Sequence, residues 1–209
     1  MSLKSVSIPA KTAEPAGAIV ALHGWGSNCY DLQSLVPVLN LPNYQFEFPE
    51  GPFPHPYVAG GKMWYDLDTK EYRGLAESRE MLGNWLMSLE SKTGMPLSRT
   101  ILGGFSQGGA MTLDVGLSFP MAGLICLSGY LHALSQPSSN VLPPTLIVHG
   151  RRDTVVPVSA AVRSRDALTA LGVPVQYQEF DMGHEILPEV IDLMRSFVLQ
   201  TMPKSSYKV

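Results

Sequence analysis

Short runs of apolar residues alternate along the chain with segments whose apolar residues recur at helical spacing. The run from Ala18 to Leu22 is continuously apolar, which is typical of a strand buried on both faces of a sheet. The same pattern predicts three further buried strands, at Thr100–Gly103, Gly123–Leu127 and Thr145–His149. Gln45–Phe48 and Val175–Phe180 are also predicted strands, and the alternation in the second favours an edge or a less buried position.

Three of the intervening segments predict helices. Apolar residues from Leu75 to Leu89 recur at spacings of three, four and seven, with charged residues off that stripe. Pro157–Leu171 has a proline in its first turn and stops before Gly172, and Val190–Val198 marks an amphipathic C-terminal helix. Strands that alternate with helices predict an α/β fold, with a mostly parallel central sheet covered by helices on both faces. No repeat or linker is evident, so a single domain over residues 1–209 is expected.

The segment Gly104-Phe105-Ser106-Gln107-Gly108 follows one predicted strand and precedes a helical pattern. A nucleophilic serine needs this strand-turn-helix context, because the sharp turn projects its hydroxyl from the edge of the sheet. The two glycines allow the strand and helix to approach closely, and the helix N-terminus supplies free N–H groups. Ser106 is therefore the candidate nucleophile.

A serine hydroxyl needs a base, and the base needs a carboxylate to orient it. His184 follows the last predicted strand after Gly183, at the edge where ligands bind in such sheets. Asp153 lies a few residues beyond the strand Thr145–His149 and is the preferred partner, with Asp181 as the alternative. The order Ser106, Asp153, His184 is the order expected for an α/β-hydrolase.

Acyl transfer also needs donors for a developing oxyanion. The backbone N–H of Gln107 follows the nucleophile directly, and that of Trp25 lies in the Gly24-Trp25-Gly26 turn after the first buried strand. The side chains expected to wall the substrate pocket are Trp25, Met63, Trp64 and Phe105. The loop Gly51–Leu67 could equally be a packed surface loop.

The other histidines are expected to have lesser roles. His149 is expected to make a structural hydrogen bond, and His23 to shape the site without acting as base. His55 and His132 lie in Pro-rich or polar loops and are expected to be solvated. Neither the histidines nor Cys29 and Cys126 have metal-site spacing, so no metal or cofactor is expected and the two thiols are expected to be free.

Composition excludes several other classes of function. The net charge is −3 with no basic block, which argues against nucleic acid as the main partner. The stretch 115–150 has no charged residue, but Pro120 and Pro143-Pro144 break it, so stable membrane insertion is not expected. The N-terminus shows no signal peptide, and a cytoplasmic location is expected. The oligomeric state is left open.

These motifs together resemble the phospholipase/carboxylesterase family of α/β-hydrolases, which includes the acyl-protein thioesterases. The resemblance rests on five segments in order: Leu22-His23-Gly24-x-Gly26, Gly103–Ala110, Leu127–Leu131, His149–Pro157 and Gly183-His184. It implies an α/β-hydrolase fold, Ser106, Asp153 and His184 as the triad, and Trp25 and Gln107 as oxyanion donors. Many relatives have leucine where Trp25 stands, and the loop from Glu50 to Lys62 departs from the eukaryotic thioesterase pattern.

The function expected is hydrolysis of carboxylic esters or thioesters of short- to medium-chain or protein-linked acyl groups, through an acyl-enzyme. Only about fifteen residues, Gly129–Pro143, separate two predicted strands, which is too short for a large lid domain and predicts an open site. Two alternatives stay open: a peptidase on the same scaffold, and a non-catalytic binding protein with a hydrolase fold.

Overall fold

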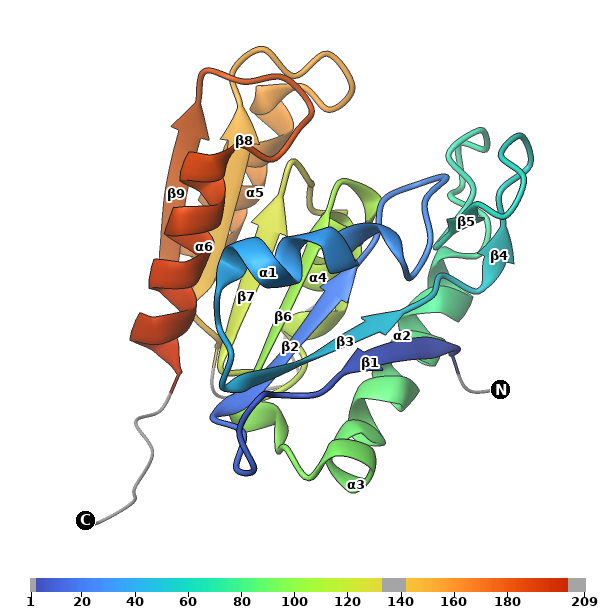
Figure 1. Cartoon of the computed structure of the whole chain (residues 1–209). Coiled ribbons are helices and arrows are strands. Elements are labelled where there is room, and N and C mark those ends of the chain that lie inside the picture. The colour runs from blue at the N-terminus through green and yellow to red at the C-terminus, as the bar shows by residue number, and fades with distance from the viewer. Residues whose placement is uncertain (1–2, 133–141, 203–209) are drawn as a thin grey trace.

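The computed structural model describes residues 3–132 and 142–202, so most of Gly129–Pro143, the connection expected to be too short for a large lid domain, lies outside the described residues. Its centre is a seven-stranded sheet (Figure 1). The strands of this sheet are β1 (Ser5–Ile8), β2 (Gly17–Leu22), β3 (Tyr44–Pro49), β6 (Thr100–Phe105), β7 (Gly123–Leu127), β8 (Thr145–Gly150) and β9 (Val175–Phe180). Their order is β1-β3-β2-β6-β7-β8-β9, and all neighbours are parallel except β1 and β3.

Helices cover both faces of the sheet, which confirms the predicted fold class. The helices are η1 (Asp31–Ser34), α1 (Leu35–Leu39), α2 (Leu75–Met87), α3 (Leu89–Thr93), η2 (Leu97–Arg99), α4 (Gln107–Gly116), α5 (Val158–Ala170) and α6 (Pro188–Thr201). Figure 1 shows α1 and α6 on one face and α2, α4 and α5 on the other. The guanidinium of Arg195 on α6 donates to the backbone oxygens of Val38 and Leu39, which ties α6 to α1.

The alternation of side chains along the strands divides the apolar residues into two cores. On β2, Val20 and Leu22 belong to the core beneath α2, α4 and α5, whereas Ile19 belongs to the core beneath α1 and α6. Every residue of β7 and β8 is buried, as their unbroken apolar runs predict. The edge strand β9 is only partly buried, which confirms the interpretation of its alternating pattern.

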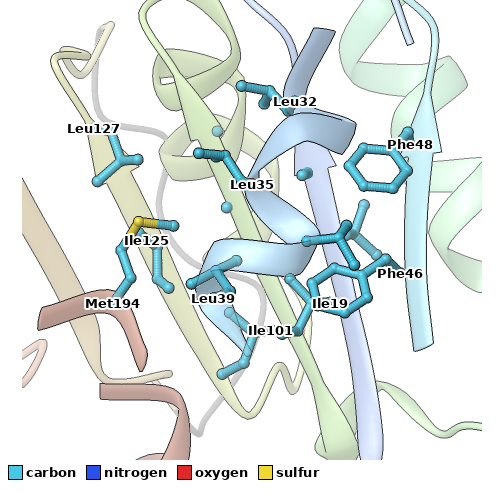
Figure 2. Close-up of a pocket in the computed structure, with 15 residues that line it drawn as sticks. Ile19, Leu32, Leu35, Leu39, Phe46, Phe48, Ile101, Ile125, Leu127 and Met194 are labelled. Carbon is cyan, nitrogen blue, oxygen red and sulfur yellow. The ribbon is translucent and has the colours of Figure 1, made fainter. Parts of the chain in front are cut away.

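A small apolar cavity of about 30 Å³ lies between α1 and the sheet. Figure 2 shows Leu32, Leu35 and Leu39 covering it from the helical side. Ile101, Ile125 and other strand residues line the opposite wall, and Gly103 adds no side chain there. The cavity therefore lies where the short helix α1 covers Gly103, a position of the sheet that has no side chain to fill the space.

Several local features differ from the sequence predictions. The sequence pattern missed β1, because a short antiparallel edge strand has only four residues to show its alternation. It also missed α1, a five-residue helix that contains Pro37, and the two-stranded ribbon of β4 (Phe53–Pro54) and β5 (Lys62–Met63). The predicted helix Leu75–Leu89 is divided between α2 and α3, and Pro157 precedes α5 as its N-cap rather than occupying its first turn.

Two glycines let the strand-turn-helix segment around Ser106 pack against its neighbours without intervening side chains. A Cβ added at Gly104 would lie 2.3 Å from the carbonyl carbon and oxygen of Gly108. A Cβ added at Gly108 would lie 2.1 Å from the backbone oxygen of Leu22 at the end of β2. Backbone atoms occupy both positions, so the segment tolerates no larger residue there.

We expect Gly108→Ala to lower the free energy of unfolding by roughly 3 kcal/mol or more, because the obstructing backbone atoms belong to a central strand. Gly83→Ala on α2 is the matched control, since its added Cβ would meet only the Phe119 ring at 3.5 Å. That variant should gain up to about 1 kcal/mol from helix propensity. Urea unfolding followed by circular dichroism measures both, and equal stability of the two variants would contradict the packing argument.

Candidate active site

Ser106 lies between β6 and α4 in a strained backbone conformation. Its φ of 55° and ψ of −117° place it in a region that residues other than glycine rarely occupy. Its N–H donates to the backbone oxygen of Leu127 over 2.8 Å, and its own carbonyl accepts from the N–H of Ala110 over 3.0 Å. These bonds fix the turn from both sides, as a serine at a sharp turn from strand to helix requires.

His184 and Asp153 meet at the same edge of the sheet, because β6, β8 and β9 are parallel and each is followed by one of the three residues. His184 Nδ1 lies 2.7 Å from Asp153 Oδ2. Asp153 Oδ1 accepts the backbone N–H groups of Val155 and Val156, each over 2.8 Å. Burial raises the pKa of Asp153, but the bonds from His184 and the two N–H groups outweigh it and hold the pKa below its ordinary value.

The alternative carboxylate does not reach the histidine. Asp181 is exposed, and its side chain lies 4.0 Å from Arg151. Arg152 bonds to the backbone oxygen of Asp181, so the start of that loop is held to the loop after β8. Of the two candidates weighed on sequence, the structure brings Asp153 to His184.

The side chains of Ser106 and His184 each have one polar atom without a hydrogen-bond partner among the described residues. Within the described residues, neither the Ser106 hydroxyl nor Nε2 of His184 makes a hydrogen bond. The Phe105 ring packs against the His184 imidazole at a centroid distance of 4.8 Å, which limits the orientation of the imidazole. Such pairs often close only around a substrate, so free ends are compatible with catalysis.

The two backbone donors expected at the site are also free. In the part of the chain that the structure describes, the N–H groups of Trp25 and Gln107 have no acceptor. A Cβ added at Gly24 would lie 3.5 Å from Ser106 Cβ, so the Trp25 turn passes directly beside the serine. The N-terminus of α4 adds positive potential at Gln107.

The side chain of Gln107, which sequence reasoning did not use, holds the neighbouring loop in place. Its Oε1 accepts the Trp64 N–H over 2.9 Å, and its Nε2 donates to the Tyr65 carbonyl over 2.8 Å. Trp64 is fully buried and donates from Nε1 to the carbonyl of His23, so the expectation that it lines the pocket is wrong. The sequence signal that could have indicated this role is the amide side chain of the residue directly after Ser106. Trp25, Met63 and Phe105 remain partly exposed.

His23 joins the Trp25 turn to the loop after β3. Its Nε2 accepts the Gly51 N–H over 2.9 Å, and its Nδ1 lies 2.8 Å from the carbonyl of Gly24. The ring is therefore neutral, with Nδ1 as the donor. Burial is the main reason that the pKa of His23 lies below its ordinary value.

The side chains of the remaining three histidines are largely enclosed by the protein. Nε2 of His149 donates to the Val156 carbonyl over 2.8 Å, so the expected structural hydrogen bond is present beside Asp153. The expectation that His55 and His132 are solvated is wrong. His55 packs on the Trp25 ring at 4.1 Å and accepts two backbone N–H groups, and His132 is bonded to Asp114. Local polarity predicted exposure, but tertiary packing encloses both rings.

Metal-binding clusters and membrane-spanning helices are absent from the residues that the structure describes. Among residues 3–132 and 142–202, no group of three or more His, Cys, Asp or Glu side chains is arranged to hold a metal ion. None of the described helices combines the length and the hydropathy needed to cross a membrane. Cys29 and Cys126 are free and buried.

Comparison with known proteins decides the family. A family model described as Phospholipase/Carboxylesterase matches residues 3–202. The chain belongs to the phospholipase/carboxylesterase family. The family match also confirms the predicted class of enzyme, a carboxylic ester hydrolase, and confirms the α/β-hydrolase fold.

Individual members of the phospholipase/carboxylesterase family match over nearly the whole chain. Acyl-protein thioesterase 1 of Neurospora crassa is 29% identical, over 96% of this chain and 93% of the relative. Lysophospholipase-like protein 1 of Mus musculus is 27% identical, over 95% of this chain and 94% of the relative. Among solved structures, esterase PE8 is 29% identical with a TM-score of 0.88, over 97% of this chain and 100% of that chain.

We expect the stability advantage of wild type over His23→Phe to shrink as the pH falls. The unfolded histidine takes up a proton near its ordinary pKa of about 6.5. The folded one resists protonation because its pKa is lowered. The stability that the neutral His23 ring contributes is therefore fully present above the ordinary histidine pKa. It is lost as the pH falls toward the lower pKa of His23 in the folded protein. Urea unfolding at about pH 8 and about pH 5 measures this, and a constant difference would contradict it.

Proposed function

We propose that this protein hydrolyses carboxylic esters or thioesters by two-step acyl transfer at Ser106. The observation that carries the proposal is the 2.7 Å contact between His184 and Asp153, at the edge of the sheet where Ser106 adopts its strained turn. Asp153 orients the imidazole and favours its protonated form during the reaction. Ser106 is the nucleophile, and His184 is the general base.

In the first step, Nε2 of His184 takes the hydroxyl proton as Ser106 Oγ attacks the carbonyl carbon. The carbonyl oxygen becomes an oxyanion and accepts the N–H groups of Trp25 and Gln107, whose freedom from other bonds supports this role. The tetrahedral intermediate collapses, and the imidazolium gives its proton to the departing alcohol or thiol. Water then repeats the sequence on the acyl-enzyme, which releases the acid and restores Ser106.

The substrates proposed are short- to medium-chain or protein-linked acyl groups. The relatives named acyl-protein thioesterase support this class, because they match the chain almost from end to end. Trp25, Met63 and Phe105 are partly exposed apolar side chains and are proposed to contact the substrate. The proposal needs no metal or cofactor, because three side chains and two backbone N–H groups supply the nucleophile, proton transfer and charge stabilisation.

We expect Ser106→Ala to lower kcat for a neutral ester such as ethyl valerate by about a thousandfold or more, because no other group replaces the nucleophile. The variant should also resist labelling by a fluorophosphonate. Ser118→Ala, two residues beyond the end of α4, is the matched control and should behave as wild type. An active Ser106→Ala enzyme would refute the assignment, and an unlabelled, inactive wild type would favour a binding protein.

We expect the acid side of the pH profile of kcat/KM to report a single proton. The pKa of Asp153 lies below its ordinary value, so its carboxylate stays ionised on the acid side of the profile. Only neutral imidazole acts as base, so kcat/KM for a neutral ester should fall by about tenfold per pH unit on the acid side. A steeper, two-proton fall would show that the carboxylate titrates in the same range and would contradict the proposed roles.

A further inference from the structure

A groove of about 510 Å³ lies beside the loop that carries Asp153. Its walls come from the segment after β7, the loop before α2, the loop after β8 and one face of α5. The side of α5 that forms the floor has Ala160, Ser164 and Ala167 at spacings of four and three, so small side chains leave the groove open. The Ser164 hydroxyl accepts the Leu131 N–H over 2.9 Å and fixes the opposite wall to the helix.

Hydrogen bonds connect this groove to both halves of the proposed reaction centre. Val155 and Val156 line the groove, and their N–H groups hold the Asp153 carboxylate. On the other side, the Tyr130 hydroxyl lies 2.7 Å from the Tyr65 hydroxyl, and the Tyr65 carbonyl accepts from Gln107. The groove therefore shares one wall with the loop that positions Asp153, and its other wall is linked to the residue that follows Ser106.

Arg163 is the unpaired cation of this groove. Its one hydrogen bond within the described residues is a 3.3 Å contact to Ser159 Oγ, and no described carboxylate lies within ion-pair distance. None of the described residues lining the groove is Asp or Glu. By contrast, Arg79, Arg151 and Arg165 each have a carboxylate within 3.1 Å. The guanidinium is thus available to an anion from outside the chain.

Another part of the groove wall is built from aromatic rings that surround the buried carboxylate of Asp114. His132 Nδ1 lies 2.7 Å from Asp114 Oδ2, which also accepts the Arg79 guanidinium over 2.8 Å. The His132 ring is edge-on to Tyr72 and Tyr130, each at a centroid distance of 5.1 Å. These contacts give the wall a fixed shape.

Tyr72 lines the groove in an energetically unfavourable backbone conformation. Its φ of 48° is in the left-handed region, which a bulky side chain adopts only when its surroundings impose it. Its hydroxyl makes no hydrogen bond among the described residues, although it lines the same groove as Arg163. Backbone strain of this kind is concentrated at ligand sites, as it is at Ser106.

We propose that this groove selects substrates with a carboxylate several bonds from the scissile carbonyl, which Arg163 and the Tyr72 hydroxyl bind together. This inference rests on the proposed function and names its substrate class. The methylene groups between the two ends of the substrate pack on Val155, Pro157 and Ala160. The guanidinium pairs with the carboxylate, and the phenol donates to it.

Matched esters test this selectivity on the whole protein. Monoethyl glutarate and ethyl valerate have the same chain length and differ by one terminal carboxylate on the acyl side. The acetate ester of γ-hydroxybutyrate and butyl acetate make the same comparison on the alcohol side. Wild type should have a higher kcat/KM for the charged member of one pair, measured by pH-stat, and the pair that responds identifies which side of the substrate enters the groove.

Arg163→Gln should reduce the ratio of charged to neutral kcat/KM by about tenfold, the effect of one charge-assisted hydrogen bond, and leave the neutral ester unchanged. Tyr72→Phe should reduce the same ratio by less. Arg165→Gln is the control on the same helix, because Arg165 pairs with Asp166 and lies outside the groove. An unchanged ratio in Arg163→Gln, or a wild-type preference for both neutral esters, overturns the subsite. Failure to hydrolyse any of the four esters instead overturns the proposed function and the subsite with it.

Discussion

Direct backbone contact between the Ser106 turn and β2 is the constraint on which the rest of the site depends. Gly108 lies against the Leu22 carbonyl, and Gly104 lies against Gly108, so no side chain separates the central strands from α4. This close approach lets the turn pass through a strained φ and brings the Trp25 loop beside the serine. Ser106, the two free N–H groups and the start of α4 are therefore positioned by main-chain atoms, which have little freedom to move.

Neutral, buried side chains then fix the loops that the backbone leaves free. His23 joins the loops after β2 and β3, and Gln107 joins α4 to the segment after β5. Two carboxylates with buried side chains, Asp153 and Asp114, each accept hydrogen bonds from several donors. Satisfied polar groups of this kind keep loop geometry uniform without burying an unpaired charge.

The sequence was sufficient for features that depend on local pattern or on strand order. Unbroken apolar runs predict β6, β7 and β8, and the position of Asp153 after β8 identifies it as the partner of His184. Features that depend on packing between distant segments could not be predicted. Trp64 is buried because hydrogen bonds to Gln107 and His23 hold its loop against the sheet. The His132 side chain is buried because Asp114 and neighbouring tyrosines surround it. Nothing in the local sequence around Tyr72 marks its left-handed conformation.

The void beneath α1 has a consequence for the mechanical behaviour of the fold. Because its walls are apolar, water gains little by entering it, and the space is eliminated only when the chain unfolds. The unfolded state then occupies a smaller volume, so hydrostatic pressure acts against the folded state at this position.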